Sequence, residues 1–341
     1  MIYLGLELLS LSLYAMVALQ RDSKVAAESA VKYFVMGGLA SGFLLYGISL
    51  VYGTMGTIII SDIAAALKAN ETTLVTQFGL VFLVIGLAFK FGAVPFHMWL
   101  PDIYHGAPSS TTAYIASAPK IAAFGMAIRI LDETFALYAK DWSQMILILG
   151  LLSVAFGNVV AVAQHNFKRM LAYSAIAHIG YFLLAIVVHN DAGYAAAMYY
   201  IIVYAVMTLA GFGIVIFLST TGEDYDNISD LKGMGEHHPW YALLFSFVMV
   251  SMAGIPPFIG FWPKLEIFRV LLDAGLVFEA VIAIAFSVVG LFYYLRVIKE
   301  MYFAQTDNRP NIATSRSMKI ALSLNCLLLL VLGLTPDSVY Q

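Results

Sequence analysis

Long apolar runs separated by short polar connectors follow one another along the whole chain. An α-helix needs about 20 apolar residues to cross the hydrocarbon core of a membrane. The sequence divides into ten such runs, at about residues 2–20, 29–53, 73–103, 109–131, 143–165, 168–189, 192–219, 239–273, 276–304 and 317–335. The pattern therefore predicts an all-α polytopic membrane protein with about ten transmembrane helices.

The third and eighth runs are too long for one simple span, and both contain prolines. Pro95 and Pro101 interrupt the third run, and Pro256, Pro257 and Pro263 interrupt the eighth. An internal proline removes a backbone hydrogen bond that lipid cannot replace, so protein or internal water must surround the gap. Both runs are expected to form broken helices, near Pro95 and near Pro256-Pro257.

The spacing of the two broken runs predicts internal repeats. They lie five helices apart, and a five-helix unit repeated once reverses its direction across the membrane, as in inverted-repeat transporters. Residues 143–304 would form the second repeat and residues 315–335 a trailing transmembrane helix. Residues 1–135 would form an incomplete first repeat, because the matching position of its broken helix requires one more helix before Met1. The chain is on this ground expected to be truncated or shortened at its N-terminus.

The composition agrees with a membrane protein and excludes several other classes. Apolar residues make up 61% and charged residues 11%, with a mean hydropathy of +0.86, whereas soluble domains have roughly 45–50% and 25%. A single cysteine, Cys326, excludes a disulfide framework, a thiolate-held iron–sulfur cluster and a structural zinc site. The net charge of −3 includes no basic block, so the lipid bilayer and not nucleic acid is the expected partner.

Three lysines lie inside apolar runs, where charge is costly. Lys120 is near the middle of the fourth run, where a lysine costs about 2.5–3.5 kcal/mol by insertion scales. Lys90 precedes the gap at Pro95, and Lys264 directly follows Pro263. Such positions favour a role in moving protons, because burial disfavours a charged amine and helps it to release its proton. The alternatives are a permanent staple to a carboxylate at Lys120 and local bonding to freed carbonyls at Lys90 and Lys264.

One carboxylate and two histidines complete the candidate proton path. Glu7 is the acidic residue of the first run, and Lys90 is its first candidate partner; a place near the membrane surface is the alternative. His97 and His178 are second-tier relay candidates, since imidazole titrates near physiological pH. Histidines satisfied by interior hydrogen bonds are the alternative for both. No His pair has the i, i+4 spacing of a helical metal site, and no nucleotide motif is present, so neither metal nor cofactor is expected in this chain.

Several segments are specific enough to indicate a family. They are GLAFKFGAVPFHMWLPDIYHGAP at 86–108, APKIAAFG at 118–125, KRMLAYSAIAHIGY at 168–181 and SMAGIPPFIGFWPK at 251–264. The chain resembles the subunit N family of bacterial proton-translocating NADH:quinone oxidoreductase, the type I NADH dehydrogenase or respiratory complex I, more than its paralogues L and M or the Mrp-type antiporters. The resemblance implies an antiporter-like fold of two inverted five-helix repeats, with this chain starting at the family's fifth helix.

The same resemblance implies a function and a set of residues. The family's glutamate of the fifth helix falls on Glu7, and the lysines of the two broken helices and of the intervening helix fall on Lys90, Lys264 and Lys120. Electron transfer from NADH through FMN and iron–sulfur clusters to a quinone such as ubiquinone takes place in other subunits of that enzyme. This chain is implied to be a translocase subunit without redox chemistry of its own, beside other membrane-arm subunits in the bacterial plasma (inner) membrane.

Two other functions remain open at this stage. The chain could be a cation/proton antiporter component of Mrp type, although sodium favours oxygen ligands and the central residues here are lysines. It could also be a non-conducting scaffold, because of the expected truncation. A proton path further requires hydroxyls or water between the amines, and Ser117 and Tyr173 are the predicted bridges.

Overall fold

The computed structural model describes residues 1–69, 73–219, 226–305 and 315–336, and these residues fold almost entirely into helices. The α-helices are α1 Ile2–Val17, α2 Lys24–Met55, α3 Ile60–Ala69, α4 Leu74–Phe91, α5 Trp99–Gly106, α6 Ser109–Ile115, α7 Ala118–Ile128, α8 Ala139–Val162, α9 Phe167–Val187, α10 Asp191–Leu218, α11 Met234–His237, α12 Pro239–Ala253, α13 Phe261–Asp273, α14 Val277–Phe303 and α15 Arg316–Leu334. No β-strand occurs among the described residues. The all-α prediction is confirmed.

Eight helical segments in the described part of the chain are long and apolar enough to cross a membrane. Two shorter apolar helices, α1 and α12, occupy the first and eighth predicted runs. The prediction of about ten spans is therefore confirmed. The short helix α3 was not predicted; it lies in the connector between α2 and α4.

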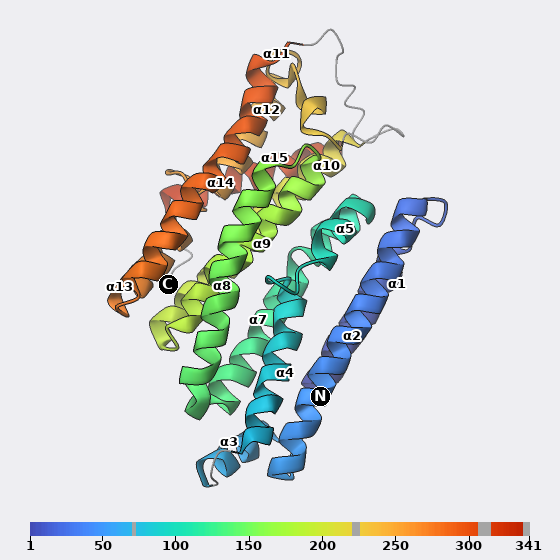
Figure 1. Cartoon of the computed structure of the whole chain (residues 1–341). Coiled ribbons are helices and arrows are strands. Elements are labelled where there is room, and N and C mark those ends of the chain that lie inside the picture. The colour runs from blue at the N-terminus through green and yellow to red at the C-terminus, as the bar shows by residue number, and fades with distance from the viewer. Residues whose placement is uncertain (70–72, 220–225, 306–314, 337–341) are drawn as a thin grey trace.

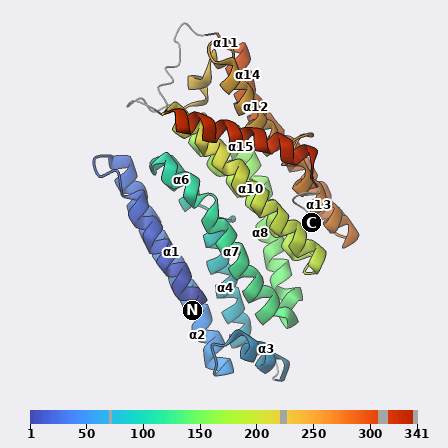
Figure 2. The same ribbon diagram turned by 180° about the vertical axis from the view of Figure 1, so that it is seen from behind.

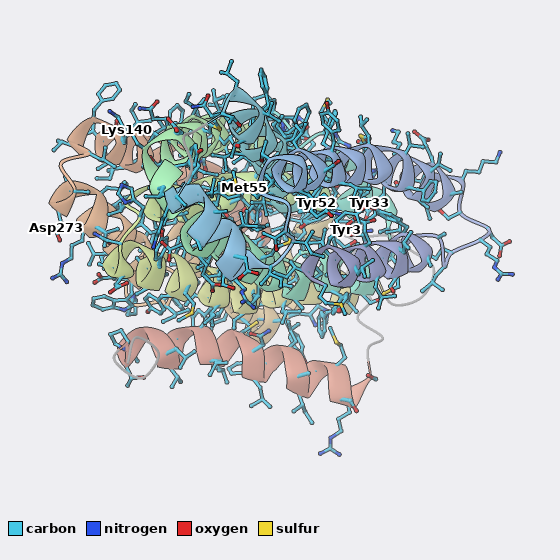
Figure 3. All side chains as sticks on the ribbon, turned by 90° about the horizontal axis from the view of Figure 1, so that it is seen from below. Tyr3, Tyr33, Tyr52, Met55, Lys140 and Asp273 are labelled. Carbon is cyan, nitrogen blue, oxygen red and sulfur yellow. The ribbon has the colours of Figure 1, made fainter. Side chains whose placement is uncertain are left out.

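The chain crosses the molecule from one side to the other. Helices α1, α2 and α4 lie at one side in Figure 1 and α12, α13 and α14 at the other, with α8 and α9 between them. Helix α8 packs against both α4 and α14, and α9 against α5, α10 and α13. Helix α15 crosses α10 and α12 on the face shown in Figure 2 and forms an outer layer along one edge in Figure 3.

The third and eighth predicted runs are broken, as the prolines predicted. Helix α4 ends at Phe91 and α5 begins at Trp99, whereas α12 ends at Ala253 and α13 begins at Phe261. The two first halves end alike, because Gly92 and Gly254 adopt the left-handed backbone, with φ of 78° and 80°. In this conformation their N–H groups bond back to the last turn of the helix. The remaining terminal carbonyls of each first half are left for partners outside the helix. Whether the two halves of the chain are related by inversion stays a prediction.

The fourth predicted run contains an interruption that the sequence analysis did not predict. Helix α6 ends at Ile115 and α7 begins at Ala118, so Lys120 lies in the first turn of α7 and not within one continuous helix. Pro119 explains the restart, since proline fits the first turn of a helix, where its missing N–H would be unbonded anyway.

Small residues let α8 and α9 approach closely at the centre. A Cβ atom on Gly157 would lie 2.5 Å from the Ala177 nitrogen, and one on Gly180 would lie 2.6 Å from the Val154 nitrogen. Such small-residue contacts are typical of membrane helix pairs, where close van der Waals packing replaces the hydrophobic driving force. These glycines therefore allow α9 to pack closely against α8 between the two sides of the molecule.

Candidate functional site

Glu7 on α1 and Lys90 on α4 form an ion pair. Lys90 Nζ lies 3.7 Å from Glu7 Oε1 and donates a hydrogen bond of 2.7 Å to Ser10 Oγ. The Ser41 hydroxyl of α2 donates to the same Glu7 oxygen. Ser10 follows Glu7 by three residues and so shares its helix face. The predicted partnership of Glu7 and Lys90 is confirmed, and both serines could have been sought by the same spacing argument.

Lys120 binds the carbonyl end of the first broken helix. It is 1% exposed, and its Nζ donates to the carbonyl oxygen of Phe91, the last residue of α4. Nζ also lies 5.1 Å from the centre of the Trp99 ring, a cation–π arrangement. Helix carbonyl ends carry partial negative charge, so a lysine is a suitable partner for this one.

A small cavity joins Lys90 to Lys120. Its volume is about 30 Å³, and Ser10, Tyr33 and Trp99 also line it. One water molecule needs roughly 10–15 Å³ of such space, so this cavity can hold one or two. The first two lysines therefore share a space in which water can connect them.

Lys264 binds the carbonyl end of the second broken helix. Its Nζ donates hydrogen bonds of 3.2 Å to the Met252 carbonyl and 2.9 Å to the Ala253 carbonyl at the end of α12. It also lies 3.4 Å from Ser287 Oγ and 5.3 Å from the centre of the Tyr181 ring. The sequence pairs Lys264 with Lys90, because both flank a gap. The contacts instead pair Lys264 with Lys120, since each of these two lysines holds the carbonyl end of a broken helix.

All three lysines point into the protein, as predicted. Lys120 and Lys264 are buried, and the Lys90 side chain is 10% exposed. Charged side chains within membranes almost always face the bundle interior, because contact with lipid is costly for a charge. None of the three amines lies on the lipid-facing surface.

His178 lies in a buried group of hydroxyls between α9, α10 and α14. Its Nδ1 lies 2.7 Å from the Tyr200 hydroxyl and its Nε2 3.1 Å from the Tyr294 hydroxyl, which in turn bonds to Ser174. Nearby, Asn158 bonds to the Tyr181 and Tyr293 hydroxyls, at 3.4 and 3.1 Å. This is a satisfied interior histidine, and an imidazole bonded to hydroxyls at both nitrogens is also well placed to pass a proton.

Three other predicted residues have side chains that bond neither to the three lysines nor to His178 among the described residues. The half-buried His97 lies in the α4–α5 gap, with its ring 4.7 Å from that of Phe156 and its buried Nδ1 without a partner among the described residues. The Ser117 hydroxyl donates to the Ala113 and Tyr114 carbonyls of its own helix turn. Tyr173 packs against Phe156 instead of facing a lysine. Neither hydroxyl bonds to a lysine among the described residues, so bridging by Ser117 or Tyr173 stays a prediction.

An aromatic layer stands between the two sets of polar groups. The Phe182 ring of α9 lies 5.0 Å from that of Phe91 and 6.3 Å from that of Phe124. Its neighbour Tyr181 faces Lys264 on the other side. The three phenylalanine rings carry no polar atom and offer no proton carrier between Lys120 and Tyr181.

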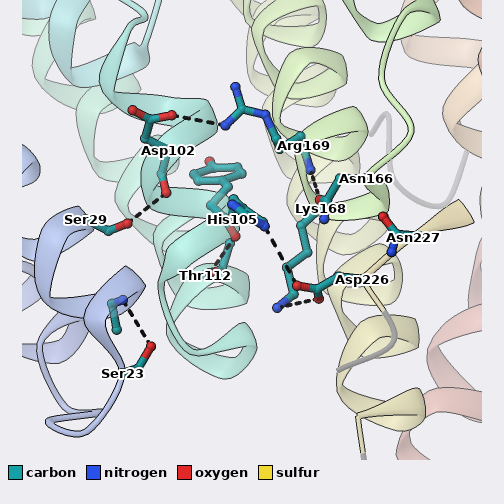
Figure 4. Close-up of polar contacts among 12 residues, drawn as sticks. Ser23, Ser29, Asp102, His105, Thr112, Asn166, Lys168, Arg169, Asp226 and Asn227 are labelled. Atoms are coloured by element: carbon teal, nitrogen blue, oxygen red, sulfur yellow. Dashed lines mark hydrogen bonds and ion pairs between the residues drawn. The ribbon is translucent and has the colours of Figure 1, made fainter. Parts of the chain in front are cut away.

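A charged cluster at one end of the helices ties the second half of the first broken helix to α2 and α9, and its contact with α9 is drawn in Figure 4. Asp102 of α5 pairs with Lys32 of α2 at 2.9 Å and with Arg169 of α9 at 3.1 Å. Sequence analysis missed this role of Asp102, although a carboxylate within a broken helix was a usable signal. The pairs fix α5 between α2 and α9.

A large cavity opens beside this cluster. Its volume is about 1100 Å³, and His105, Lys168 and Asp226 line part of it. Lys168 pairs with Asp226 at 2.8 Å, and His105 Nε2 lies 3.9 Å from the same carboxylate (Figure 4). The cavity is roomy enough to hold water at this end of the helices.

Potential metal ligands are scattered over the described residues. No group of three or more His, Cys, Asp or Glu side chains in these residues is placed to hold a metal ion. The thiol of Cys326 is free and buried on α15.

Comparisons with known proteins bear on the whole chain. Residues 1–290 match the family described as NADH:quinone oxidoreductase/Mrp antiporter, TM. The chain is 50% identical over 337 residues to NADH-quinone oxidoreductase subunit N of Thiobacillus denitrificans. The aligned region covers 98% of this chain and 70% of that relative. It is 49% identical to the subunit N of Hydrogenovibrio crunogenus, and that alignment covers 99% of this chain and 71% of the relative.

A solved structure agrees with these relatives. Respiratory complex I from Thermus thermophilus with bound aureothin contains a chain that superposes with a TM-score of 0.84 at 34% identity, over 99% of this chain and 73% of that one. The antiporter-like fold expected from the sequence is thus confirmed. This chain belongs to the family of NADH-quinone oxidoreductase subunit N.

Proposed function

We propose that this chain conducts protons across the bacterial inner membrane as a membrane-arm subunit of an NADH:quinone oxidoreductase. The observation that carries the proposal is the pair of buried lysines, Lys120 and Lys264, each bound to the carbonyl end of a broken helix. Broken helices within membranes expose backbone groups that bind ions. An amine held there mainly by neutral groups can lose its proton without leaving a bare carboxylate behind.

Each site residue has a separate role in this proposal. The Glu7–Lys90 pair sets the proton affinity of the Lys90 amine, since a nearby carboxylate favours the charged form. Lys120 receives the proton through water in the shared cavity. Lys264 and His178 carry it through the hydroxyl-rich second side. No step is assigned to His97, whose ring contacts Phe156.

The redox chemistry is proposed to lie in other subunits of the complex. NADH, FMN, iron–sulfur clusters and quinone would all bind outside this chain. Its own residues only hold and move protons, so the chain is a translocase subunit of an enzyme. Its partners are the other membrane-arm subunits and the lipid bilayer.

Two alternatives make different demands on the same residues. A sodium-coupled antiporter would need a cluster of oxygen ligands, whereas the charged carriers here are three amines. A non-conducting scaffold would not need to bury them. The scaffold alternative predicts that proton pumping does not depend on Lys90, whereas the antiporter alternative predicts that proton movement depends on sodium.

Lys90→Met is the test of the proposed function. It removes the amine and keeps an unbranched apolar side chain, so NADH-driven acidification of membrane vesicles should fall at least about tenfold. NADH oxidation by an artificial acceptor, which bypasses the membrane arm, should remain and would show that the complex is assembled. Lys140→Met, at an exposed lysine, is the matched control and should pump normally. Full pumping by the assembled Lys90→Met variant would refute the proposal.

A further inference from the structure

Two buried tyrosines from different parts of the chain meet beside the aromatic layer. Tyr104 lies on α5, the second half of the first broken helix, and Tyr204 lies at the middle of α10. Tyr104 is 0% and Tyr204 2% exposed. Their side chains interact with each other. This contact joins a helix of the first side to a helix of the second.

The two hydroxyls lie near each other, and that of Tyr204 also lies near Thr208, but none of these contacts has the geometry of an ordinary hydrogen bond among the described residues. A buried polar group without a partner costs about 1–3 kcal/mol, and native proteins contain few of them. Phenylalanine would pack equally well at both places and would avoid this cost. Two such hydroxyls facing one another therefore indicate a use for them, with transient bonding to each other or to water.

Tyr204 leads from this contact to the second side. Its ring centre lies 5.3 Å from that of His178. One helix turn earlier on α10, Tyr200 bonds to His178 directly. Tyr204 is thus next to the cluster of hydroxyls around His178, which includes those of Tyr200 and Tyr294.

Tyr104 leads to the first side. Its ring centre lies 6.5 Å from that of Trp99, on which Tyr33 stacks with ring centres 5.0 Å apart. Trp99 and Tyr33 both line the cavity that contains Lys90 and Lys120. Tyr104 therefore contacts a residue that lines the water-sized space of the first side, although it does not line that space itself.

We propose that Tyr104 and Tyr204 relay protons between the Lys90–Lys120 cavity and His178, past the Phe91–Phe182 contact. Each hydroxyl oxygen accepts a proton from one side while its own O–H bond breaks and releases a proton to the other. The side chains are unchanged after a turn of each hydroxyl, and no oxidant or reductant is required. This inference rests on the proposed function and adds its missing central step.

The test uses Tyr104→Phe and Tyr204→Phe, singly and together, in the complete complex in membrane vesicles. Both substitutions keep the ring packing and remove one oxygen. Tyr138→Phe is the matched control, because Tyr138 is also buried with a hydroxyl that lacks a described partner, but it lies in the turn before α8. Measurements are NADH-driven acidification, its ratio in H₂O and D₂O, and NADH oxidation by an artificial acceptor.

Each single variant should pump at least about tenfold more slowly, as expected for loss of a proton carrier. The double variant should be no slower than the slower single variant, because the two hydroxyls act in series. Tyr138→Phe should pump normally, and the H₂O/D₂O ratio should change only in the Tyr104 and Tyr204 variants, which a purely structural role would not produce. Normal pumping by both single variants would overturn the relay. If Lys90→Met then still abolishes pumping, the proposed function stands without it, whereas normal pumping in Lys90→Met as well would refute both.

Discussion

The two sides of the molecule use the same backbone arrangement in different electrostatic surroundings. On each side a buried lysine donates to the carbonyl end of a helix that stops in mid-membrane, Lys120 at Phe91 and Lys264 at Met252 and Ala253. The first side adds a second amine, Lys90, which pairs with Glu7. The surroundings of Lys264 are two carbonyls, the Ser287 hydroxyl and the Tyr181 ring.

The two sides therefore differ in how strongly the proton affinity of their lysines depends on helix movement. Attraction between Lys90 and Glu7 depends on their distance, so any movement of α1 relative to α4 changes how firmly Lys90 holds its proton. The neutral groups around Lys264 change much less with such a movement. We therefore propose that control of the proton belongs to the first side, whereas the second side serves as a hydroxyl-rich carrier.

Loss of the carrier on the second side is expected to have the largest effect. Lys264→Met should reduce NADH-driven proton pumping at least about tenfold, because no other amine binds the end of α12 in the described part of the chain. Vesicle acidification measures this, with NADH oxidation by an artificial acceptor as the assembly control. Pumping at the normal rate would break the comparison, since the second side would then not carry protons.

Loss of control on the first side is expected to have an intermediate effect. Glu7→Gln keeps the shape and an oxygen for the Ser41 hydroxyl but removes the charge 3.7 Å from Lys90. A partly buried pair worth about 1 kcal/mol corresponds to roughly fivefold in the proton equilibrium of Lys90. Pumping should fall by a similar factor, and its dependence on pH should shift. A loss as complete as that of Lys264→Met would make Glu7 a carrier and not a modulator.

The smallest effect is expected at His97, which belongs to neither side. His97→Phe keeps the aromatic contact with Phe156 and removes both ring nitrogens. Pumping should be indistinguishable from that of the unmodified chain, whereas His178→Phe, which removes bonds to Tyr200 and Tyr294, should impair it. Equal loss in the two variants would place a proton route through the α4–α5 gap.

Local backbone rules explain how much of the fold was predictable. Prolines predicted both gaps, because their effect on a membrane helix is local and severe. The restart at Ala118 was missed, although Pro119 gave the same kind of signal, since the apolar run around it has an ordinary length. The ion pair of Glu7 with Lys90 was predictable because a buried charge requires a partner.

The surroundings of the lysines were harder to predict, because they depend on contacts between distant helices. Nothing in the sequence near Lys120 indicates that it binds the carbonyl of Phe91, and nothing near Tyr104 indicates Tyr204. Ser117 was a reasonable bridge by position, yet its hydroxyl bonds to its own helix. A hydroxyl near a lysine in sequence has this local option, so true bridges have to be sought in space.

The central claim is that Lys120 carries a proton and does more than bind the end of α4, and Lys120→Arg tests it most directly. Arginine keeps the positive charge and the donors for the Phe91 carbonyl but does not release its proton. In complexes that retain NADH oxidation by an artificial acceptor, Lys120→Arg should pump as poorly as Lys120→Met. Pumping at the normal rate by Lys120→Arg would mean that a permanently charged helix cap is sufficient and would contradict the account.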